Sequence, residues 1–375
     1  MKFYATLSPG LEEIAKEDVI NLGGKILEVR EGKGRIFFKG KEELIAKTNY
    51  LSRTLERINI LLHREKVENL EDIYKIIYNI DWSFIDENQS FAIRPLRVGV
   101  HNFTSIDIGR VAGEALIKSY QKDKNVRLKV NLDNPDVIVR VELIFNELLV
   151  GLDTTGDVAL DKRGWRVFNH PAHLNATIAA SLVYFSNFKD DETLLDVMCG
   201  SGTIPIEAAL LKRNIPPGIF REKKYSFQFL KLFGYNLLNK IKENISMNNN
   251  IYNIYGFDKN PKFIDGAKEN ANNANVLDTI NFDVGDAEHF NMKFDIIITN
   301  PPYGIRMGRK KYIKKLYENF LSSAKKNMHG DARIIVITAE TKLFKDAIYK
   351  NNLEIKKNFK VMFGGLLTEV FYLTL

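Results

Sequence analysis

The feature that most constrains this fold is an alternation of strand and helix patterns from about residue 173 to the C-terminus. Short apolar runs such as NIYGF and DIIIT are separated by segments of helix length. Such alternation predicts a mostly parallel, doubly wound sheet with helices on both faces. Two strand patterns around Gly364-Gly365 then predict an antiparallel hairpin at the end of the sheet. We therefore expect a Rossmann-like α/β domain over residues 173–375.

The first strand pattern of this region, TLLDVMCGSGTIPIEAALL, joins a strand to a helix through a glycine-rich turn. A dinucleotide site has a third glycine where this chain has Pro205, and a phosphate-binding loop needs a Gly-Lys-Ser/Thr sequence that the turn lacks. Asp196 at the strand end would repel a pyrophosphate but attract the ammonium group of a methionine moiety. The turn therefore favours S-adenosylmethionine, with Gly200 and Gly202 letting the backbone approach it.

Two later strand patterns also end in carboxylates. Asp258 follows NIYGF, and Asp286 with Ala287 follows INFDVG. A carboxylate after the second strand can accept hydrogen bonds from both ribose hydroxyls, and an acid beside a small residue suits the edge of an adenine. Ligands of open α/β sheets bind at the carboxyl ends of the strands. We therefore expect these carboxylates to share one cofactor site with Asp196.

The most informative stretch is KFDIIITNPPYG, which places Asn300-Pro301-Pro302-Tyr303 after a buried strand pattern. An amino group conjugated to a ring is a poor nucleophile because its lone pair is delocalised. The side-chain oxygen of Asn300 and the carbonyl of Pro301 can hold both amino hydrogens, and the prolines fix these acceptors in advance. Tyr303 offers a face on which a flipped base can stack. The motif predicts methyl transfer to a planar, amide-like or ring nitrogen without a strong general base.

Cys199 and two histidines are the other candidates for chemistry near these motifs. Cys199 lies inside the glycine turn, where a small side chain is needed, and is interpreted as a packing residue rather than a nucleophile. It is the only cysteine, which excludes an internal disulfide and a cysteine-based metal cage. His170 and His173 precede the helix pattern NATIAASLV, where they either contact the cofactor or cap the helix.

Positive charge is concentrated in the C-terminal half. Residues 1–172 hold 26 basic and 26 acidic residues, so the whole net charge of +7 lies in residues 173–375. Within that half, RMGRKKYIKK carries six positive charges and no negative one, directly after the NPPYG motif. Such a run attracts phosphate backbones. It predicts RNA contacts by Arg306, Arg309, Lys310, Lys311, Lys314 and Lys315.

The sequence shows neither a membrane span nor an export signal. No apolar run approaches the about 20 residues of a membrane span, and the N-terminal sequence MKFYATLSPGLEEIAKED lacks the pattern of a signal peptide. We therefore expect a soluble, cytoplasmic protein.

The N-terminal half reads as small α+β units. Residues 1–40 give strand, helix, strand and strand, and SIDIGRVAGEALIKSYQ gives a helix that Ser105 is expected to cap. VRLKVNL, DVIVRVELIF and ELLVGLDTTG give further strands. The runs HNFTSIDIGRVAGEAL and VNLDNPDVIVRVELIFNELLVGLDTTG resemble a THUMP domain, with which RNA-modifying enzymes grip tRNA. The unit before it resembles the ferredoxin-like domain that accompanies THUMP. The expected domains are ferredoxin-like (1–52), THUMP (53–155), a linker (156–172) and a class I methyltransferase domain (173–375).

The order DVMCGSGTIPIEA, GFD, GDA and NPPYG behind a THUMP-like domain resembles the archaeal and bacterial tRNA (guanine-N2)-methyltransferases that modify guanosine-6 of the acceptor stem. The resemblance implies S-adenosylmethionine as donor, N2-methylguanosine as product and Asn300, Pro301, Pro302 and Tyr303 as catalytic residues. Relatives that methylate guanosine-10 usually begin this motif with Asp, so Asn300 favours the guanosine-6 group. The expected cofactor contacts are His173, Asn175, Asp196, Gly200, Ser201, Gly202, Thr203, Asp258, Lys259, Asp286, Ala287 and Asn300.

Two other functions stay open at this point, and a third is excluded. A ribosomal RNA guanine-N2 or an adenine-N6 methyltransferase would carry the same motif, and so would a non-catalytic RNA-binding protein that kept the fold. A nicotinamide oxidoreductase is contradicted by Pro205 and by the terminal hairpin. The basic and aromatic insertion within residues 213–248 has no role that its sequence assigns.

Overall fold

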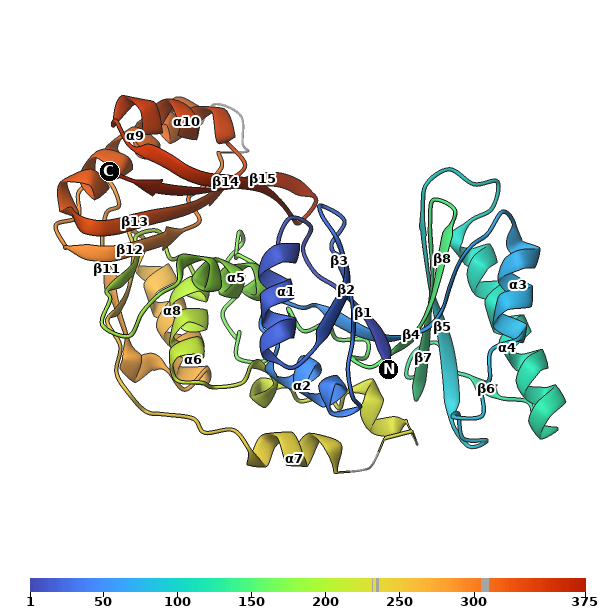
Figure 1. The fold of residues 1–375 in the computed structure, drawn as a ribbon. Coiled ribbons are helices and arrows are strands. Elements are labelled where there is room, and N and C mark those ends of the chain that lie inside the picture. Colours follow the sequence, from blue (N-terminus) through green and yellow to red (C-terminus); the bar gives the residue numbers. More distant parts are fainter. Residues whose placement is uncertain (231, 234–235, 305–309) are drawn as a thin grey trace.

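The computed structural model describes residues 1–230, 232–233, 236–304 and 310–375. Figure 1 shows two sheets with their helices, the N-terminal strands at the centre and right and the C-terminal strands at the left. Among the described helices, none combines the length and the apolarity that crossing a membrane requires.

The strands of the N-terminal half form one sheet in the order β2-β3-β1-β4-β8-β7-β5-β6. Aromatic and β-branched residues fill these strands, and their alternation places Phe3, Ile36 and Phe38 in the core. The strands are β1 (Lys2–Thr6), β2 (Lys25–Arg30), β3 (Arg35–Lys39), β4 (Arg57–Lys66), β5 (Ser90–Val98), β6 (Lys129–Val130), β7 (Val137–Ile144) and β8 (Glu147–Asp153).

Strand β4 joins the ferredoxin-like and THUMP-like units into this single sheet. One edge of β4 pairs with β1, with Ile58 opposite Ala5, and the other edge pairs with β8, with Ile60 opposite Leu152. Both pairings are antiparallel. The two units therefore share backbone hydrogen bonds and are not linked by a chain segment alone.

Helices cover this sheet, namely α1 (Glu12–Asn21), α2 (Glu43–Leu51), α3 (Leu70–Tyr78) and α4 (Ser105–Lys124). The expected Ser105 cap of α4 was wrong by one residue. Thr104 is the cap, because its hydroxyl accepts from the Asp107 N–H while the Asp107 carboxylate accepts from the Thr104 N–H. The expected strand VRLKVNL is also shorter than predicted, since only Lys129 and Val130 pair with β5.

The C-terminal half contains the predicted parallel sheet and its closing hairpin. The order is β11-β10-β9-β12-β13-β15-β14, parallel from β11 to β13 and antiparallel in the last two pairings. Gly364 and Gly365 adopt positive φ in the turn of the hairpin. The strands are β9 (Leu194–Asp196), β10 (Ile254–Asp258), β11 (Ile280–Val284), β12 (Phe294–Thr299), β13 (Met328–Thr338), β14 (Glu354–Phe363) and β15 (Leu366–Thr374).

Helices pack on both faces of this sheet (Figure 1). Side chains of α5 (Ala176–Ser186), α6 (Thr203–Lys212) and α8 (Pro261–Asn273) belong to one buried cluster, and those of α9 (Lys310–Asn327) and α10 (Thr341–Lys350) to another. The central strand β12 is apolar because it is covered on both sides, with Ile296 and Ile298 in the first cluster and Ile297 in the second.

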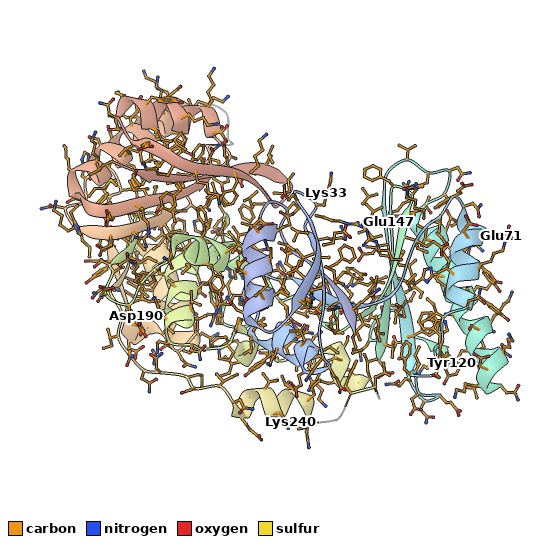
Figure 2. The ribbon with its side chains drawn as sticks, viewed as in Figure 1. Lys33, Glu71, Tyr120, Glu147, Asp190 and Lys240 are labelled. Carbon is orange, nitrogen blue, oxygen red and sulfur yellow. The ribbon has the colours of Figure 1, made fainter. Side chains whose placement is uncertain are left out.

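The expected linker and the insertion pack against the rest of the protein. In the expected linker, Trp165 is fully buried and Arg163 forms an ion pair with Glu207 of α6 at 3.1 Å. The insertion contains η1 (Pro217–Phe220), η2 (Ser226–Phe229) and α7 (Leu237–Glu243), which carries Lys240 on its outer surface (Figure 2). The Phe227 N–H donates to the Thr154 carbonyl at 3.1 Å, just beyond the end of β8. The insertion therefore connects the N-terminal sheet to the C-terminal half through a backbone hydrogen bond.

Candidate active site

The carboxyl ends of the parallel strands border a cavity of about 750 Å³. Parallel strands end at a common edge, so motifs that are far apart in the chain meet there. Most residues predicted from the sequence line this cavity, namely His173, Asp196, Gly200, Ser201, Thr203, Asp258, Lys259, Asp286, Ala287, Asn300, Pro301, Pro302 and Tyr303.

Two residues of the expected cofactor set do not line the cavity. The Asn175 side chain caps α5, accepting from the N–H of Thr177 at 3.0 Å. Gly202 has φ +79°, and a Cβ there would lie 3.0 Å from the Cβ of Ala267. These two residues shape the turn and the helices behind the cavity, and their contact with the cofactor stays a prediction.

Asp196 lies at the floor of the cavity and is 2% exposed. Burial raises the pKa of its carboxyl from 3.8 to about 7, although the Thr299 hydroxyl and the Met198 N–H donate to it and oppose that rise. The Thr299 bond is 2.7 Å long and comes from the residue directly before Asn300. Thr299, which sequence reasoning missed, thus ties the first strand end to the fourth.

The second strand end braces the glycine turn. Asp258 accepts from the N–H of Gly200 at 3.1 Å and from the N–H of Asn260 at 2.9 Å. Gly200 takes φ +52°, a conformation that glycine adopts without strain. Further along the same edge, Asp286 is exposed at the rim and Ala287 is buried. Carboxylates therefore lie at the floor, wall and rim of one cavity.

The NPPY loop is held by hydrogen bonds from two tyrosines. The Tyr303 hydroxyl donates to the side-chain oxygen of Asn300 at 2.6 Å, and the Tyr317 hydroxyl donates to the Pro302 carbonyl at 3.0 Å. Tyr317 is in turn 2.9 Å from the Thr338 hydroxyl at the end of β13. Tyr303 was expected to stack against a base; the structure shows that its hydroxyl also fixes the orientation of the Asn300 amide. The loop is therefore anchored before any ligand binds.

One wall of the cavity comes from the β14–β15 hairpin, which the sequence did not place there. Phe363, Gly364 and Leu366 line the cavity beside the NPPY loop. The hairpin is held from outside, because the N–H of Met362 donates at 2.8 Å to the carbonyl of Pro9, which lies in the turn between β1 and α1. The paired glycines signalled a turn, but no local pattern shows which loop a hairpin tip will face.

Cys199 and the two histidines have distinct surroundings. Burial raises the pKa of the Cys199 thiol well above its ordinary value, which suits packing and not nucleophilic attack. The His170 ring packs edge-on against Phe263 with centroids 4.2 Å apart and lies against Gly200. His173 is exposed, and Asn175 rather than either histidine caps α5. Both histidines border the cavity mouth.

Helix α9 contributes apolar side chains to the cavity and carries exposed lysines on its outer side. Ile313 and Leu316 line the cavity, and the Tyr312 hydroxyl accepts from the Lys259 ammonium at 2.6 Å. Of the expected RNA contacts, Arg306 and Arg309 lie outside the described residues. The others are exposed on the first two turns, and we call Lys310, Lys311, Lys314 and Lys315 the α9 lysines.

Comparison with known proteins places this geometry in a family. The model of the RMKL-like methyltransferase domain matches residues 163–369, more than half of the chain. The chain belongs to the RMKL-like methyltransferase family. A THUMP domain matches residues 67–153 and an RlmL ferredoxin-like domain residues 2–59, so β4 spans the interval between them. The predicted fold class, with ferredoxin-like and THUMP domains before a methyltransferase domain, is confirmed.

Two sequence relatives and one solved structure are similar to this chain over nearly its whole length. A tRNA (guanine(6)-N2)-methyltransferase of Methanocaldococcus jannaschii is 71% identical over 100% of both chains. One of Archaeoglobus fulgidus is 49% identical over 99% of this chain and 91% of the relative. The crystal structure of SMU.472 complexed with SAH is 25% identical, with a TM-score of 0.86 over 99% of this chain and 97% of that chain. The prediction that the chain is a methyltransferase is confirmed.

Proposed function

We propose that this enzyme transfers a methyl group from S-adenosylmethionine to the exocyclic N2 of a guanosine in tRNA, with guanosine-6 of the acceptor stem as the target. The observation that carries the proposal is that the Asn300–Pro301 corner and the strand-end carboxylates line the same cavity. The names of the two full-length relatives support tRNA and guanosine-6 as the substrate. A tRNA substrate also favours the cytoplasm as the site of action.

The residues of the cavity fit S-adenosylmethionine. Asp196 offers a carboxylate for an ammonium group, Asp258 a carboxylate for ribose hydroxyls, and the Asp286–Ala287 pair an edge for adenine. When bound, S-adenosylmethionine supplies an activated methyl group on a positively charged sulfur. The SAH bound to the structurally similar SMU.472 supports this ligand.

The target amino group would be held by two oxygens of the NPPY loop. An amide oxygen has two lone pairs, so Asn300 keeps one for an amino hydrogen while it accepts from Tyr303. The Pro301 carbonyl holds the second hydrogen. Two acceptors favour a pyramidal nitrogen whose lone pair would bond to the methyl carbon as the carbon–sulfur bond of the donor breaks, with S-adenosylhomocysteine as the leaving group. The methylated nitrogen would then lose its excess proton to water. Because Tyr317 and Thr338 already anchor the loop, little reorganisation accompanies the reaction.

Side chains around the loop would hold the base itself. Tyr303 and Phe363 supply aromatic surface and Leu366 supplies aliphatic surface beside the two acceptors. Stacking on such surfaces compensates a flipped base for the neighbours it loses. The apolar wall also excludes water, which strengthens the hydrogen bonds from the amino group.

Methylation of purified RNA with a labelled donor tests the proposed function. We expect label in bulk tRNA and, after nuclease digestion and mass spectrometry of a tRNA transcript, N2-methylguanosine at position 6. Label confined to ribosomal RNA, or found on adenine, would reject the proposal in favour of the alternatives with the same motif. Calorimetry without any S-adenosylmethionine binding would instead indicate a non-catalytic RNA-binding protein.

A further inference from the structure

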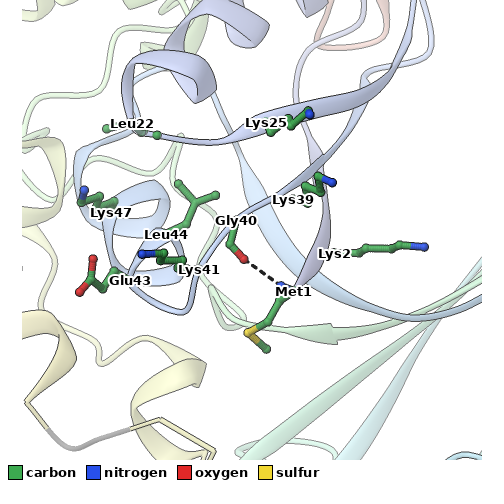
Figure 3. A pocket seen from close by; sticks show the side chains of 11 residues that line it. Met1, Lys2, Leu22, Lys25, Lys39, Gly40, Lys41, Glu43, Leu44 and Lys47 are labelled. Carbon is green, nitrogen blue, oxygen red and sulfur yellow. Dashed lines mark hydrogen bonds between the residues drawn. The ribbon is translucent and has the colours of Figure 1, made fainter.

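A second cavity, of about 550 Å³, lies in the ferredoxin-like domain (Figure 3). It lies where β1 and β2 begin and β3 ends, and α2 forms its other side. Its floor includes Leu22 and Leu44, and its only acidic lining residue among those described is Glu43. We call it the lysine concavity after the residues of its rim, which are Lys2, Lys25, Lys39, Lys41 and Lys47.

Three of these lysines form a row of like charges across neighbouring strands. Lys39 of β3 is directly opposite Lys2 of β1 on one side and Lys25 of β2 on the other. Directly opposed side chains in antiparallel strands are close neighbours, and like charges at such positions destabilise a sheet. Nothing in the packing requires lysine there, since all three side chains are exposed. The row therefore does not stabilise the fold by itself, but it would attract an anionic ligand.

The charges of the concavity are not compensated within the protein. In the part of the chain that the structure describes, none of the five ammonium groups has a carboxylate within 4.0 Å. By contrast, Arg30 and Arg64 in the same sheet are paired with Glu28 and Glu147 at 2.5–2.7 Å. The N-terminal half is neutral in total, but the structure pairs some cations and gathers unpaired ones in this concavity.

The spread of the ammonium groups indicates what kind of anion fits. In Figure 3, Lys2, Lys25 and Lys39 extend on the sheet side, while Lys41 and Lys47 extend on the α2 side. A small anion would need the donors to converge on one point. Adjacent strands are about 4.8 Å apart, so the three lysines of the row are spaced about as far apart as successive phosphates of a nucleic-acid strand.

We propose that the lysine concavity binds the phosphate backbone of the RNA substrate, away from the nucleotide that is methylated. The inference rests on the proposed function for the identity of the RNA. Because β4 joins the ferredoxin-like domain to the THUMP domain in one sheet, a contact here adds to a THUMP contact without an entropic cost of ordering a linker. The ferredoxin-like domain is then part of the RNA-binding surface and not a spacer.

A charge-removal experiment tests the proposal with a matched control. The test variant is Lys25→Ala/Lys39→Ala/Lys47→Ala. The control, Lys33→Ala/Lys189→Ala/Lys268→Ala, removes the same number of positive charges at exposed positions elsewhere, with Lys33 in the turn at the far end of β2 (Figure 2). Binding of a tRNA transcript is measured between about 50 and 300 mM salt, a range over which phosphate contacts weaken strongly as salt rises. Methylation kinetics and thermal melting are measured alongside.

We expect the test variant to bind tRNA about tenfold more weakly at low salt, with the slope of log K against log salt reduced by about 2 to 3. Its kcat at saturating tRNA and its cofactor Kd should match the control. It should melt no lower than wild type, because the substitutions remove opposed like charges. A variant with arginine at the same positions should retain the wild-type slope.

Three outcomes separate the possible failures. A test variant that binds tRNA with the slope of the control would overturn the proposal while leaving the proposed function intact. A wild-type protein that neither binds nor methylates tRNA would instead reject the proposed function. Loss of binding to phosphatidylserine vesicles, with unchanged tRNA binding, would assign the concavity to an anionic membrane surface and also overturn the proposal.

Discussion

Replacing Thr299 by Val should shift the pH dependence of cofactor binding, because Thr299 donates its hydroxyl to the Asp196 carboxylate. The pKa of Asp196 is about 7, raised by burial and lowered in part by this hydrogen bond. Below its pKa the carboxyl is neutral and no longer attracts the ammonium group of S-adenosylmethionine. Affinity of the wild-type enzyme should therefore fall as the pH drops below about 7, by about tenfold for each unit.

The size of the shift follows from the strength of the lost bond. A hydrogen bond to a charged group contributes about 1.5–3 kcal/mol, and one pKa unit corresponds to about 1.4 kcal/mol. Without the hydroxyl, the pKa of Asp196 should rise by about 1 to 2 units. At pH 7 the ionised fraction of Asp196 then falls from about one half to between about 10% and 1%. The apparent Kd for the cofactor should therefore rise about 5- to 50-fold.

Calorimetric titration from pH 5.5 to 9 measures this dependence, a range that spans about 1.5 units or more on either side of the wild-type pKa. Thr299→Ser keeps a hydroxyl and should keep the wild-type profile. Asp196→Asn should bind weakly without the acid limb. If wild-type affinity were flat from pH 5.5 to 8, a range of about 2.5 pH units around the pKa, Asp196 would not pair with the cofactor ammonium, and the assignment would fail.

Three further predictions concern the loop, the helix and the domain contact. Asn300→Ala should abolish turnover while cofactor Kd in calorimetry stays within a few-fold; near-wild-type turnover would refute the amine-holding role. Neutralising the α9 lysines should flatten the salt dependence of tRNA binding, and an unchanged slope would assign them to solubility. Gly10→Ala should destabilise the protein in chemical denaturation by more than about 2 kcal/mol, because φ is +100° and the new Cβ would lie 1.8 Å from the Lys360 carbonyl oxygen. Gly23→Ala, at φ +96° with nothing within 4 Å, should cost only about 1 kcal/mol; equal losses would show that the contact with β14 is unimportant.

The ends of the parallel strands are the part of the site that local patterns reveal best. Asp196, Asp258, Asp286 and Asn300 each follow an apolar run, and the sheet brings them to one edge because parallel strands all end on the same side. Residues beside this edge are harder to assign from the sequence. Asn175 and Gly202 are next to cavity residues in sequence, yet one caps a helix and the other packs against α8.

The sequence by itself determined the order of the elements, the parallel sheet with its hairpin and the polar groups at its edge, because these depend on periodicity and on residues adjacent in the chain. Only the tertiary structure decided the partners of those groups. The bond from Thr299 to Asp196, the hairpin tip at Phe363 and the pairing of β4 with both β1 and β8 join segments many residues apart. The same holds for Lys2, Lys25 and Lys39, which look scattered in a neutral half and become one row when three strands pair. Such contacts are set by the packing of the whole chain, and no local pattern carries them.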